Sequence, residues 1–194
     1  MPGERAGTSG VPERKRLDLR PDCSRCFGLC CVAPPFAASE DFAIDKEAGE
    51  ACPHLRHDFR CDIHAALRER GFPGCAVYDC FGAGQQVAQV TFGGTDWRQA
   101  PDTAPQMFDS FMIMRQLHEL LWYLAEALEL EQAAPLRGEL SSALADIERL
   151  TYYDADALGK VNVAGHRRRV SALLLAAGDL VRAAGRITRV GGEA

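Results

Sequence analysis

The hydrophobic and polar positions of the chain follow two different patterns on either side of Asp96. After Asp96, large apolar residues recur every three or four positions, which is the period of a helix with one buried face. Before Asp96, the apolar residues are irregularly spaced and are interrupted by glycine and proline turn formers. The pattern therefore predicts a helical C-terminal part and a loop-rich N-terminal part.

Three apolar stripes predict three helices in the C-terminal part. The first helix is expected to be capped by Asp102-Thr103 and to reach about Leu130. The second begins near Pro135, and the third lies between a cap at Asn162 and a closing Gly185. Short connections favour an antiparallel three-helix bundle. The stripes are Met107, Phe111, Met114, Leu117, Leu121, Leu124 and Leu128, then Leu136, Leu140, Leu144, Ile147 and Leu150, then Val163, Val170, Leu173, Leu174, Ala177, Leu180, Val181 and Ala184.

Two local patterns predict elements in the N-terminal part. Asp62 to Gly71 has a cap candidate, apolar residues four apart and a closing glycine, which together favour a helix. The weak alternation from Gln85 to Phe92 favours a short strand. We predict a mostly α fold in which a small loop-rich cysteine domain is followed by the bundle. The predicted divisions are a flexible tail (1–20), a cysteine-cluster domain (21–95), the helical bundle (96–186) and a second tail (187–194).

Charge and hydropathy narrow the classes of partner. The formal net charge is −5, from 22 basic and 27 acidic residues, so the chain has no basic surface suited to nucleic acid or to an anionic membrane. No window contains the roughly 18 to 20 apolar residues that span a bilayer, and the first residues lack the apolar core of a secretory signal. We therefore expect a cytoplasmic protein, in which structural disulfides are rare.

Cysteine is confined to the N-terminal part, where it follows the pattern C-x2-C-x3-C-C, then C-P-H-L, C-D-I-H and C-x4-C. The thiolate is a soft ligand that favours zinc, copper(I) and iron–sulfur clusters, and a C-x2-C loop brings two sulfurs to one metal. Only about fourteen large apolar side chains lie between Phe27 and Phe81, too few to stabilise so loop-rich a segment by burial alone. The candidate metal ligands are Cys23, Cys26, Cys30, Cys31, Cys52, Cys61, Cys75 and Cys80.

The eight thiols leave the identity and the number of metal sites open. They would fill two four-thiolate sites, or one cluster with spare ligands. Zinc is preferred over an iron–sulfur cluster because the loop-rich segment needs a structural cross-link. In an extended backbone the side chains of the neighbouring Cys30 and Cys31 would point apart, so we expect their sulfurs to serve different sites, or one to bind the metal while the other packs or stays free. His54 and His64 are possible additional ligands. Disulfides, a thiol redox centre on Cys23-x-x-Cys26 and free core cysteines are the alternatives.

This cysteine pattern resembles the bacterial zinc- or iron-chelating cysteine-cluster proteins known as YkgJ-like, which carry a C-x-x-C-x-x-C-C core followed by C-P-x-L and C-x-I-[YH] segments. The resemblance covers about residues 22–82 and implies a metal-chelating character for the same eight cysteines. The spacing before Cys30-Cys31 is three residues here instead of two. The run "GFPGCAVYDCFGAGQ" with "RQLHELLWYL" is also similar to the N-terminal region of some bacterial pentapeptide-repeat proteins, although the tandem repeats are not present.

Motifs of enzymatic chemistry are not present in the sequence. It contains no G-x-S-x-G, P-loop, G-x-G-x-x-G or H-E-x-x-H, so an enzymatic function is not expected. His118 and Trp122 share one helix face near Arg115, which favours a contact between domains over catalysis. The sequence thus predicts a metal-binding module, structural or regulatory, that presents the bundle to a protein partner. The alternative is an iron–sulfur protein with an electron-transfer, redox-sensing or catalytic role.

Overall fold

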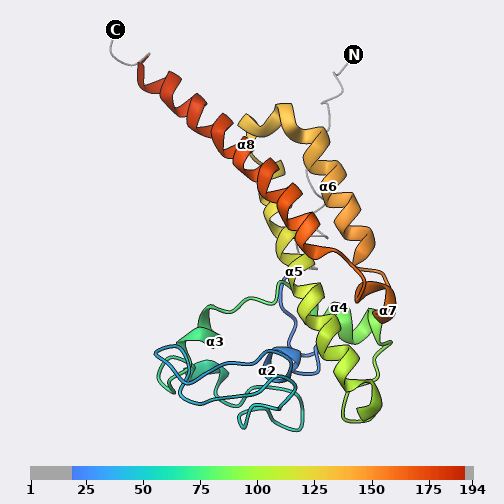
Figure 1. Ribbon diagram of the computed structural model, residues 1–194. Helices are drawn as coiled ribbons and strands as arrows, with labels where there is room; N and C mark the ends of the chain where they lie inside the picture. The colour runs from blue at the N-terminus through green and yellow to red at the C-terminus, as the bar shows by residue number, and fades with distance from the viewer. Residues whose placement is uncertain (1–18, 191–194) are drawn as a thin grey trace, which may run out of the picture.

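The computed structural model describes residues 19–190, with side chains as far as Arg186. It is mostly α-helical and contains a helical bundle, which confirms the predicted fold class (Figure 1). Of the predicted tail 1–20, all but Leu19 and Arg20 lie outside the described residues. The three long helices are α5 (Ala104–Leu128), α6 (Arg137–Leu150) and α8 (Val163–Val190).

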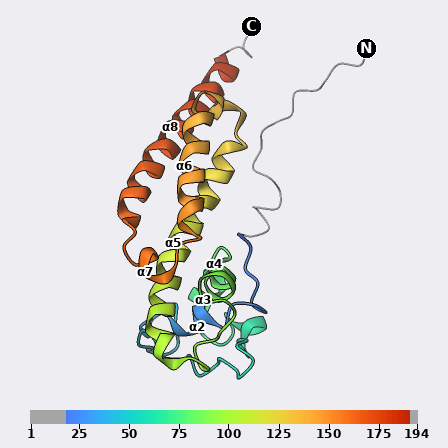
Figure 2. The ribbon, with the colours of Figure 1, turned by 90° about the vertical axis from the view of Figure 1, so that its right-hand side faces the viewer.

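The bundle is antiparallel: α5 rises away from the cysteine-rich region, α6 returns towards it, and α8 rises again (Figures 1 and 2). Every residue of the predicted α5 stripe is buried, and Met107, Phe111 and Leu117 are fully inaccessible to solvent. In α8, Val170, Leu173 and Ala177 are buried as predicted, whereas Val181 is exposed. The apolar period therefore located the buried face of each long helix.

The ends of the bundle helices differ in detail from the prediction. The helix predicted from Pro135 begins as a 3-10 helix, η4 (Glu131–Leu136), before α6. The predicted cap of α8 is present, because the Gly165 N–H donates to Asn162 Oδ1 at 3.0 Å. The predicted end at Gly185 is wrong. That glycine has no positive φ, so it does not form the left-handed C-terminal cap that would stop the helix.

The cysteine-rich region is built from short helical turns. In chain order these are α2 (Leu29–Val32), the 3-10 turn η1 (His64–Ala66), α3 (Pro73–Val77), α4 (Ala83–Gln86) and the π-helix η2 (Val87–Thr91), followed beyond the region by the 3-10 turn η3 (Pro101–Thr103) that leads into α5. Its only strand-like pairings within the described residues are two isolated bridges, Phe36 with Lys46 and Leu55 with Cys61. A four-residue helix, α7 (Ala155–Leu158), joins α6 to α8 and was not predicted.

Two predicted elements of this region are wrong. The strand Gln85–Phe92 is helical, because adjacent Val87 and Ala88 are both buried, which a strand with one buried face does not allow. The helix Asp62–Gly71 is reduced to η1. The Asp62 carboxylate forms an ion pair with His54 Nδ1 at 3.2 Å and does not cap the helix, and the Asp62 N–H donates to the His54 carbonyl. The carboxylate and the N–H of Asp62 are thus both bonded to His54, which belongs to another segment.

One apolar cluster joins the cysteine-rich region to the bundle. Leu29 and Val32 of α2, together with Ala83 of α4, belong to the same buried cluster as the α5 stripe and the inner faces of α6 and α8. Aromatic contacts extend it, since Trp97 lies 5.8 Å from both the Phe59 and the Phe108 ring. The cysteine-rich region therefore packs on the lower half of α5 (Figure 2).

Candidate metal centre

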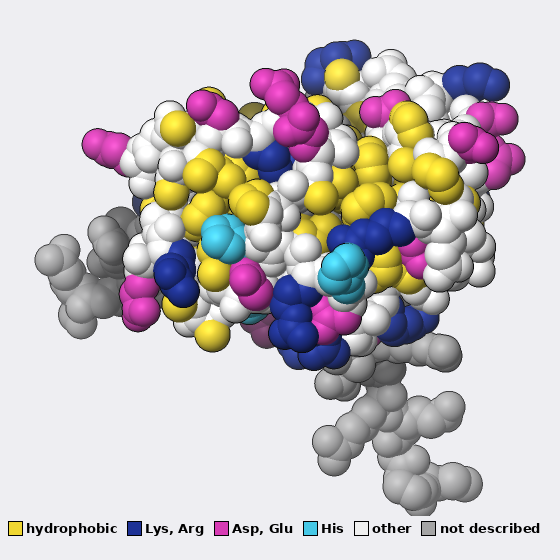
Figure 3. All heavy atoms as spheres, turned by 90° about the horizontal axis from the view of Figure 1, so that it is seen from below, with side chains coloured by type: hydrophobic (Ala, Val, Ile, Leu, Met, Phe, Trp, Pro, Cys, Tyr) yellow, Lys and Arg dark blue, Asp and Glu magenta, His cyan; other side chains and the backbone are white. Residues whose placement is uncertain are grey.

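All eight cysteines are free thiols, and they belong to the cysteine-rich region at the lower end of the molecule (Figure 1). Cys26 and Cys52 are buried, Cys23 is exposed and the other five are partly covered. Seen from below, hydrophobic side chains, a class that includes cysteine, gather in the middle of this face between basic and acidic groups (Figure 3). The region therefore has a thiol-rich interior that is close to solvent.

Two copies of the tripeptide Cys-Phe-Gly form the turns that carry Cys26 and Cys80. In each copy both residues after the cysteine have a positive φ: 53° and 66° at Phe27-Gly28, and 49° and 75° at Phe81-Gly82. This left-handed conformation is costly for phenylalanine. It turns the Gly28 N–H towards the Cys26 sulfur and the Gly82 N–H towards the Cys80 sulfur.

Backbone N–H groups that face a sulfur stabilise its thiolate form. The Ile63 N–H is a third such donor, directed to the sulfur of Cys61. In each of the three cases the donor lies two residues after the cysteine. Three separate loops thus direct a backbone N–H at a sulfur, which partly offsets the effects, burial among them, that raise the pKa of each of these thiols.

The first two cysteine pairs are close in space. The Cys30 and Cys31 sulfurs lie 3.9 Å apart, because this segment is the helix α2 and not the extended chain on which the expected divergence rested. Cys23 and Cys26 also interact through their thiols, and the Cys26 thiol lies 3.7 Å from the Cys23 carbonyl oxygen. The first turn of α4, which follows Cys80, approaches the same place: a Cβ at Gly84 would lie 2.7 Å from the Cys26 Cβ.

The thiols form two overlapping neighbourhoods. Cys30 interacts electrostatically with Cys23, Cys26 and Cys80. Among the thiols, Cys52 has the largest electrostatic effect on the pKa of both Cys61 and Cys75, and Cys30 has a smaller effect on each.

Cys31 connects these two neighbourhoods. It is the immediate neighbour of Cys30 in α2, and its carbonyl accepts the Cys52 N–H at 3.0 Å. The vicinal pair therefore stands at the junction between the two groups of thiols.

Burial keeps most of these thiols protonated in the absence of a cation. It raises the pKa of Cys61 and Cys75, and raises that of Cys80 to about 11. The hydrogen bond with Cys31, followed by burial, raises the pKa of Cys30. A bound metal ion would displace these protons, because a coordinating thiol is deprotonated outright.

Cys23 differs from the other thiols. The hydrogen bond with the Cys26 thiol lowers the pKa of Cys23 to about 6, with smaller contributions from His64 and Arg60 in the same direction. The same hydrogen bond, together with burial, raises the pKa of Cys26. An exposed, readily ionised thiol thus lies beside a buried, protonated one.

A buried lysine lies next to the second neighbourhood. Lys46 is 5% exposed, and its ammonium donates to the carbonyls of Val32, Glu47 and Glu50 at 2.9–3.0 Å. Burial lowers the pKa of Lys46, and the negative forms of Cys52 and Cys31 act against that shift. A positive charge is therefore present beside two of the candidate ligands.

Glutamine side chains of α4 and η2 hold the first cysteine loop in place. Gln85 accepts from the Asp22 N–H at 3.1 Å and donates to the Arg20 carbonyl at 2.7 Å, which fixes the entry to Cys23. Gln89 donates to the Arg25 carbonyl at 2.8 Å. These bonds tie the helical segment 83–91 to the loop that carries Cys23 at two points, since both amides lie on one face.

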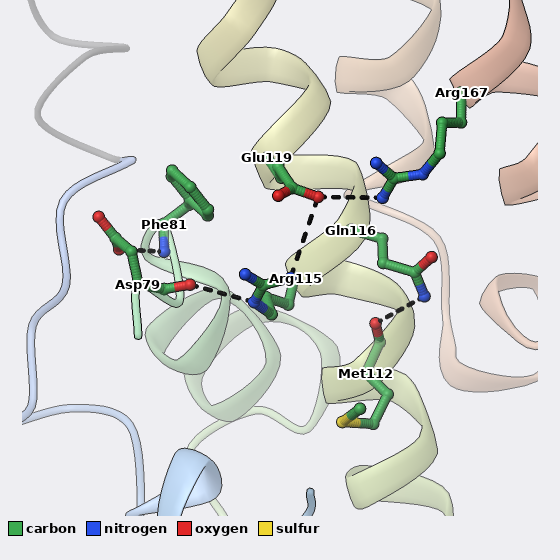
Figure 4. A network of polar contacts seen from close by, with 7 residues as sticks. All are labelled: Asp79, Phe81, Met112, Arg115, Gln116, Glu119 and Arg167. Carbon is green, nitrogen blue, oxygen red and sulfur yellow. Dashed lines mark hydrogen bonds and ion pairs between the residues drawn. The ribbon is translucent and has the colours of Figure 1, made fainter. Parts of the chain in front are cut away.

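Helix α5 holds the segment that carries Cys80 (Figure 4). The Arg115 Nε donates to the Asp79 carbonyl at 3.1 Å. His118 Nδ1 lies 2.7 Å from the Phe81 carbonyl. Arg115 also stacks over the ring of Tyr78 at 5.1 Å. Both α5 residues therefore contact the cysteine-rich region.

The contact continues into α8. Glu119 accepts from Arg167 at 3.0 Å and lies 3.9 Å from Arg115 (Figure 4). Since Glu119 is next to His118 on α5, one helix connects the turn of Cys80 to the first turns of α8.

The two histidines near the cysteines have different surroundings. His64 is exposed and lies in the electrostatic neighbourhood of Cys23. His54 is paired with Asp62 and packs edge-on against Phe72, with ring centroids 5.4 Å apart. Whether either one binds a metal stays a prediction.

The thiols, as they stand, do not surround a common point. Within the described part of the chain, no group of three or more His, Cys, Asp or Glu side chains is close enough to hold an ion. The donor chemistry nevertheless suits a soft metal, because eight thiols and several backbone N–H donors to sulfur lie in one small region. Ligation would require the sulfurs to close by side-chain rotation around the existing turns.

Sequence reasoning missed two features of this region. The Cys-Phe-Gly turns had a readable signal, since the same tripeptide occurs at 26–28 and at 80–82. Lys46 had none, because a lysine between acidic residues is expected to be solvated.

One known protein is similar to most of this chain. It is the uncharacterized protein YybG of Bacillus subtilis (strain 168), which is 53% identical over 169 residues. The match covers 87% of this chain and 61% of YybG, so the chain spans less than two thirds of that relative's length. No family model and no solved structure matches the chain. Across residues 19–190, none of the helices is both long enough and apolar enough to cross a bilayer.

Proposed function

We propose that this protein is a metal-binding cysteine-cluster protein, with zinc as the preferred ion, and that the cluster is a structural or regulatory module attached to the helical bundle. The observation that carries the proposal is the gathering of eight free thiols from four separate segments into two overlapping electrostatic neighbourhoods. Free thiols gathered at this density in a loop-rich region have few other stable uses. The resemblance to YkgJ-like proteins points to the same ligand class.

We further propose a division of the ligands into two four-thiolate sites. Cys23 and Cys26 interact directly, and both interact with Cys30, which also interacts with Cys80. These four would hold one ion. The second site would comprise Cys31, Cys52, Cys61 and Cys75.

The adjacent Cys30 and Cys31 sulfurs would then belong to neighbouring sites. Their separation of 3.9 Å allows this without unwinding α2. The rival arrangement is a single cluster with spare thiols, in which one site is filled and the remaining cysteines stay protonated.

Elemental analysis of the full chain, purified without oxygen, tests the proposal. We expect about one to two zinc ions per chain, no sulfide and no visible absorption. The variants C23S/C26S and C61S/C75S should each lose one ion while keeping the other. Val77→Ser is the matched control, because Val77 lies between Cys75 and Cys80 but is 70% exposed, so it should keep the wild-type content.

Several results of the metal measurement would contradict the proposal. A native chain without metal or sulfide would refute metal binding. Detection of iron, sulfide and a visible charge-transfer band would instead support the alternative, an iron–sulfur cluster with an electron-transfer, redox-sensing or catalytic role. Loss of all metal in both double variants would refute two independent sites in favour of a single shared one.

A thiol redox function is the second candidate, favoured by the pairing of exposed Cys23 with buried Cys26. The Cys23 thiolate would attack a disulfide and Cys26 would resolve the mixed disulfide, leaving Cys23–Cys26 oxidised and the substrate reduced to two thiols. Timed alkylation of the metal-free chain, followed by mass spectrometry, should modify Cys23 at least about tenfold faster than Cys75. Equal rates at the two positions would remove this candidate.

The module would act through a protein partner in the cytoplasm. Helix α5 connects the cysteine cluster to α8, because it contacts the Cys80 turn through Arg115 and contacts Arg167 of α8 through Glu119. The last turns of α8 continue beyond α6 (Figure 1). Neither nucleic acid nor a membrane surface is proposed as the partner, because the net charge is −5.

A further inference from the structure

Lys46 combines burial, charge and a fixed position. An ammonium has three hydrogens, and each of the three has a carbonyl acceptor: Val32 at 3.0 Å, Glu47 at 3.0 Å and Glu50 at 2.9 Å. The ring of Phe36 lies 5.4 Å from the same nitrogen. The side chain is therefore held in one place and is shielded from water.

Carbonyl acceptors satisfy the hydrogens of this lysine but do not neutralise its charge. An isolated buried cation is expensive, so a buried lysine is normally found with an anion. Among the described contacts of the Lys46 ammonium, none is an ion pair with a carboxylate. Once ionised, as in a metal-loaded site, the sulfurs of Cys52 and Cys31 would favour the charged form of this ammonium more strongly than the Glu50 and Glu47 carboxylates do.

The backbone around Lys46 also connects it to these two cysteines. Its acceptor Val32 directly follows Cys31, and the Cys31 carbonyl accepts the Cys52 N–H at 3.0 Å. The Gly49 N–H donates to the same Val32 carbonyl at 3.0 Å. One hydrogen-bonded unit thus holds the lysine, the end of α2 and the loop that carries Cys52.

We propose that Lys46 is the internal cation of the site formed by Cys31, Cys52, Cys61 and Cys75, where it positions the first two sulfurs and offsets the negative charge of the metal-loaded site. The inference rests on the two-site function proposed above. A divalent ion with four thiolates carries a net charge of −2, and the lysine reduces it to −1 for the buried unit. The other site lacks such a buried cation among the described residues and has exposed Arg60 and His64 near Cys23 instead.

An iron-loaded protein makes this charge measurable. A ferrous tetrathiolate carries one more negative charge than its ferric form, so a nearby cation favours the ferrous state and raises the reduction potential. The experiment uses the full chain with C23S/C26S, in which only the Lys46 site is filled with iron, and compares Lys46→Met with Lys46→Arg. A purely structural lysine would not change the potential.

We expect K46M to weaken ferrous relative to ferric binding about tenfold, which lowers the one-electron potential by about 59 mV. K46R should stay close to the parent chain. In the C61S/C75S chain, where the other site is filled, K46M should produce a clearly smaller change.

Gly49→Ala is the matched structural control. Gly49 has a φ of 79°, so an alanine there strains the same loop without altering any charge, and its Cβ would meet only the Phe108 ring at 3.6 Å or more. We expect G49A to lower the midpoint of thermal unfolding and to leave the potential unchanged.

The possible results separate this inference from the proposed function. If iron binds but K46M leaves the potential unchanged, Lys46 is structural and the inference fails alone. If the parent chain binds no metal, both fail. If K46M loses the helical circular dichroism signal, K46Q takes its place, because glutamine keeps a donor for the carbonyls without the charge. Loss of folding in both variants would show that Lys46 is structural and would overturn the inference.

Discussion

The cysteine-rich region and the helical bundle are stabilised in different ways. In the bundle, side chains such as Phe111 and Leu117 are fully buried along regular helices. In the cysteine-rich region the backbone is held by turns, and every positive φ of the described chain lies there, between Phe27 and Gly94. The bundle is stabilised by burial, whereas the cysteine-rich region holds strained conformations that need local fixation.

The comparison also shows why the two regions are not independent. Leu29 and Val32 share the buried cluster of α5, so the cysteine-rich region takes part of its stability from the bundle. A metal would then add to an existing apolar contact and would not be the sole support of the region. Removal of the proposed metal should accordingly loosen residues 22–82 and leave α5, α6 and α8 helical.

The largest effect is expected where the regions share their core. Phe111→Ala should lower the free energy of unfolding by about 3–5 kcal/mol, because it removes a fully buried ring from α5. Chemical denaturation followed by circular dichroism measures the loss. Hydrogen exchange should show that both regions become less protected; a loss confined to the bundle would mean that the shared core is unimportant. Leu175→Ala, at a side chain 67% exposed, is the control and should change stability by less than about 0.5 kcal/mol.

A smaller loss is expected from strain in the cysteine-rich region. Gly28 has a φ of 66°, and a Cβ there would lie 2.6 Å from Leu55 Cδ1 and 3.0 Å from the Phe59 carbonyl oxygen. Gly28→Ala should therefore cost about 2 kcal/mol or more. Gly138→Ala in α6 meets no atom within 4 Å and should instead stabilise the chain by about 0.5–1 kcal/mol. Urea midpoints that move in the same direction for both variants would contradict the expected difference between Gly28 and Gly138.

The hydrogen bond from Trp97 to the cysteine-rich region should contribute less. Its Nε1 donates to the Phe27 carbonyl at 2.9 Å, next to the turn of Cys26. Trp97→Phe keeps an aromatic ring against Phe59 and Phe108 but removes the donor, so it should cost about 1 kcal/mol. Faster hydrogen exchange at residues 26–31, without a change in α8, is the expected signature. Uniform loss of protection would indicate general repacking instead.

The smallest effect concerns an exposed ion pair in the bundle. Hydrogen bonds from Arg169 and then Arg149 lower the pKa of Asp146 below its usual value of 3.8. Because the folded pKa is the lower one, this carboxylate stabilises the fold above pH 3.8, and the contribution disappears as the pH falls through the folded pKa. Asp146→Asn should therefore lower the urea midpoint slightly at about pH 7, and this deficit should shrink as the pH falls below 3.8. A deficit that stays constant over this range of pH would show that the loss is not electrostatic.

The bundle was predictable because its signal is local and repeated. The period of the α5 stripe gives the same answer along all 25 residues of the helix, and the cap at Asn162 depends only on the next three residues. The strand predicted at Gln85–Phe92 and the helix predicted at Asp62–Gly71 failed because other segments decided their conformation. His54 pairs with Asp62, and the side chains of Gln85 and Gln89 bond to the loop of Cys23.

The sequence by itself determined the ligand chemistry and the helical faces: which residues carry thiols, and which side of each long helix is apolar. Only the tertiary structure decided which thiols are neighbours, that Lys46 is buried beside two of them, and that α5 supports the turn of Cys80. The physical reason is the range of the forces involved. Helical periodicity and capping act over a few residues, whereas the electrostatics of a thiol cluster depend on segments that are far apart in the chain and that meet only when it folds.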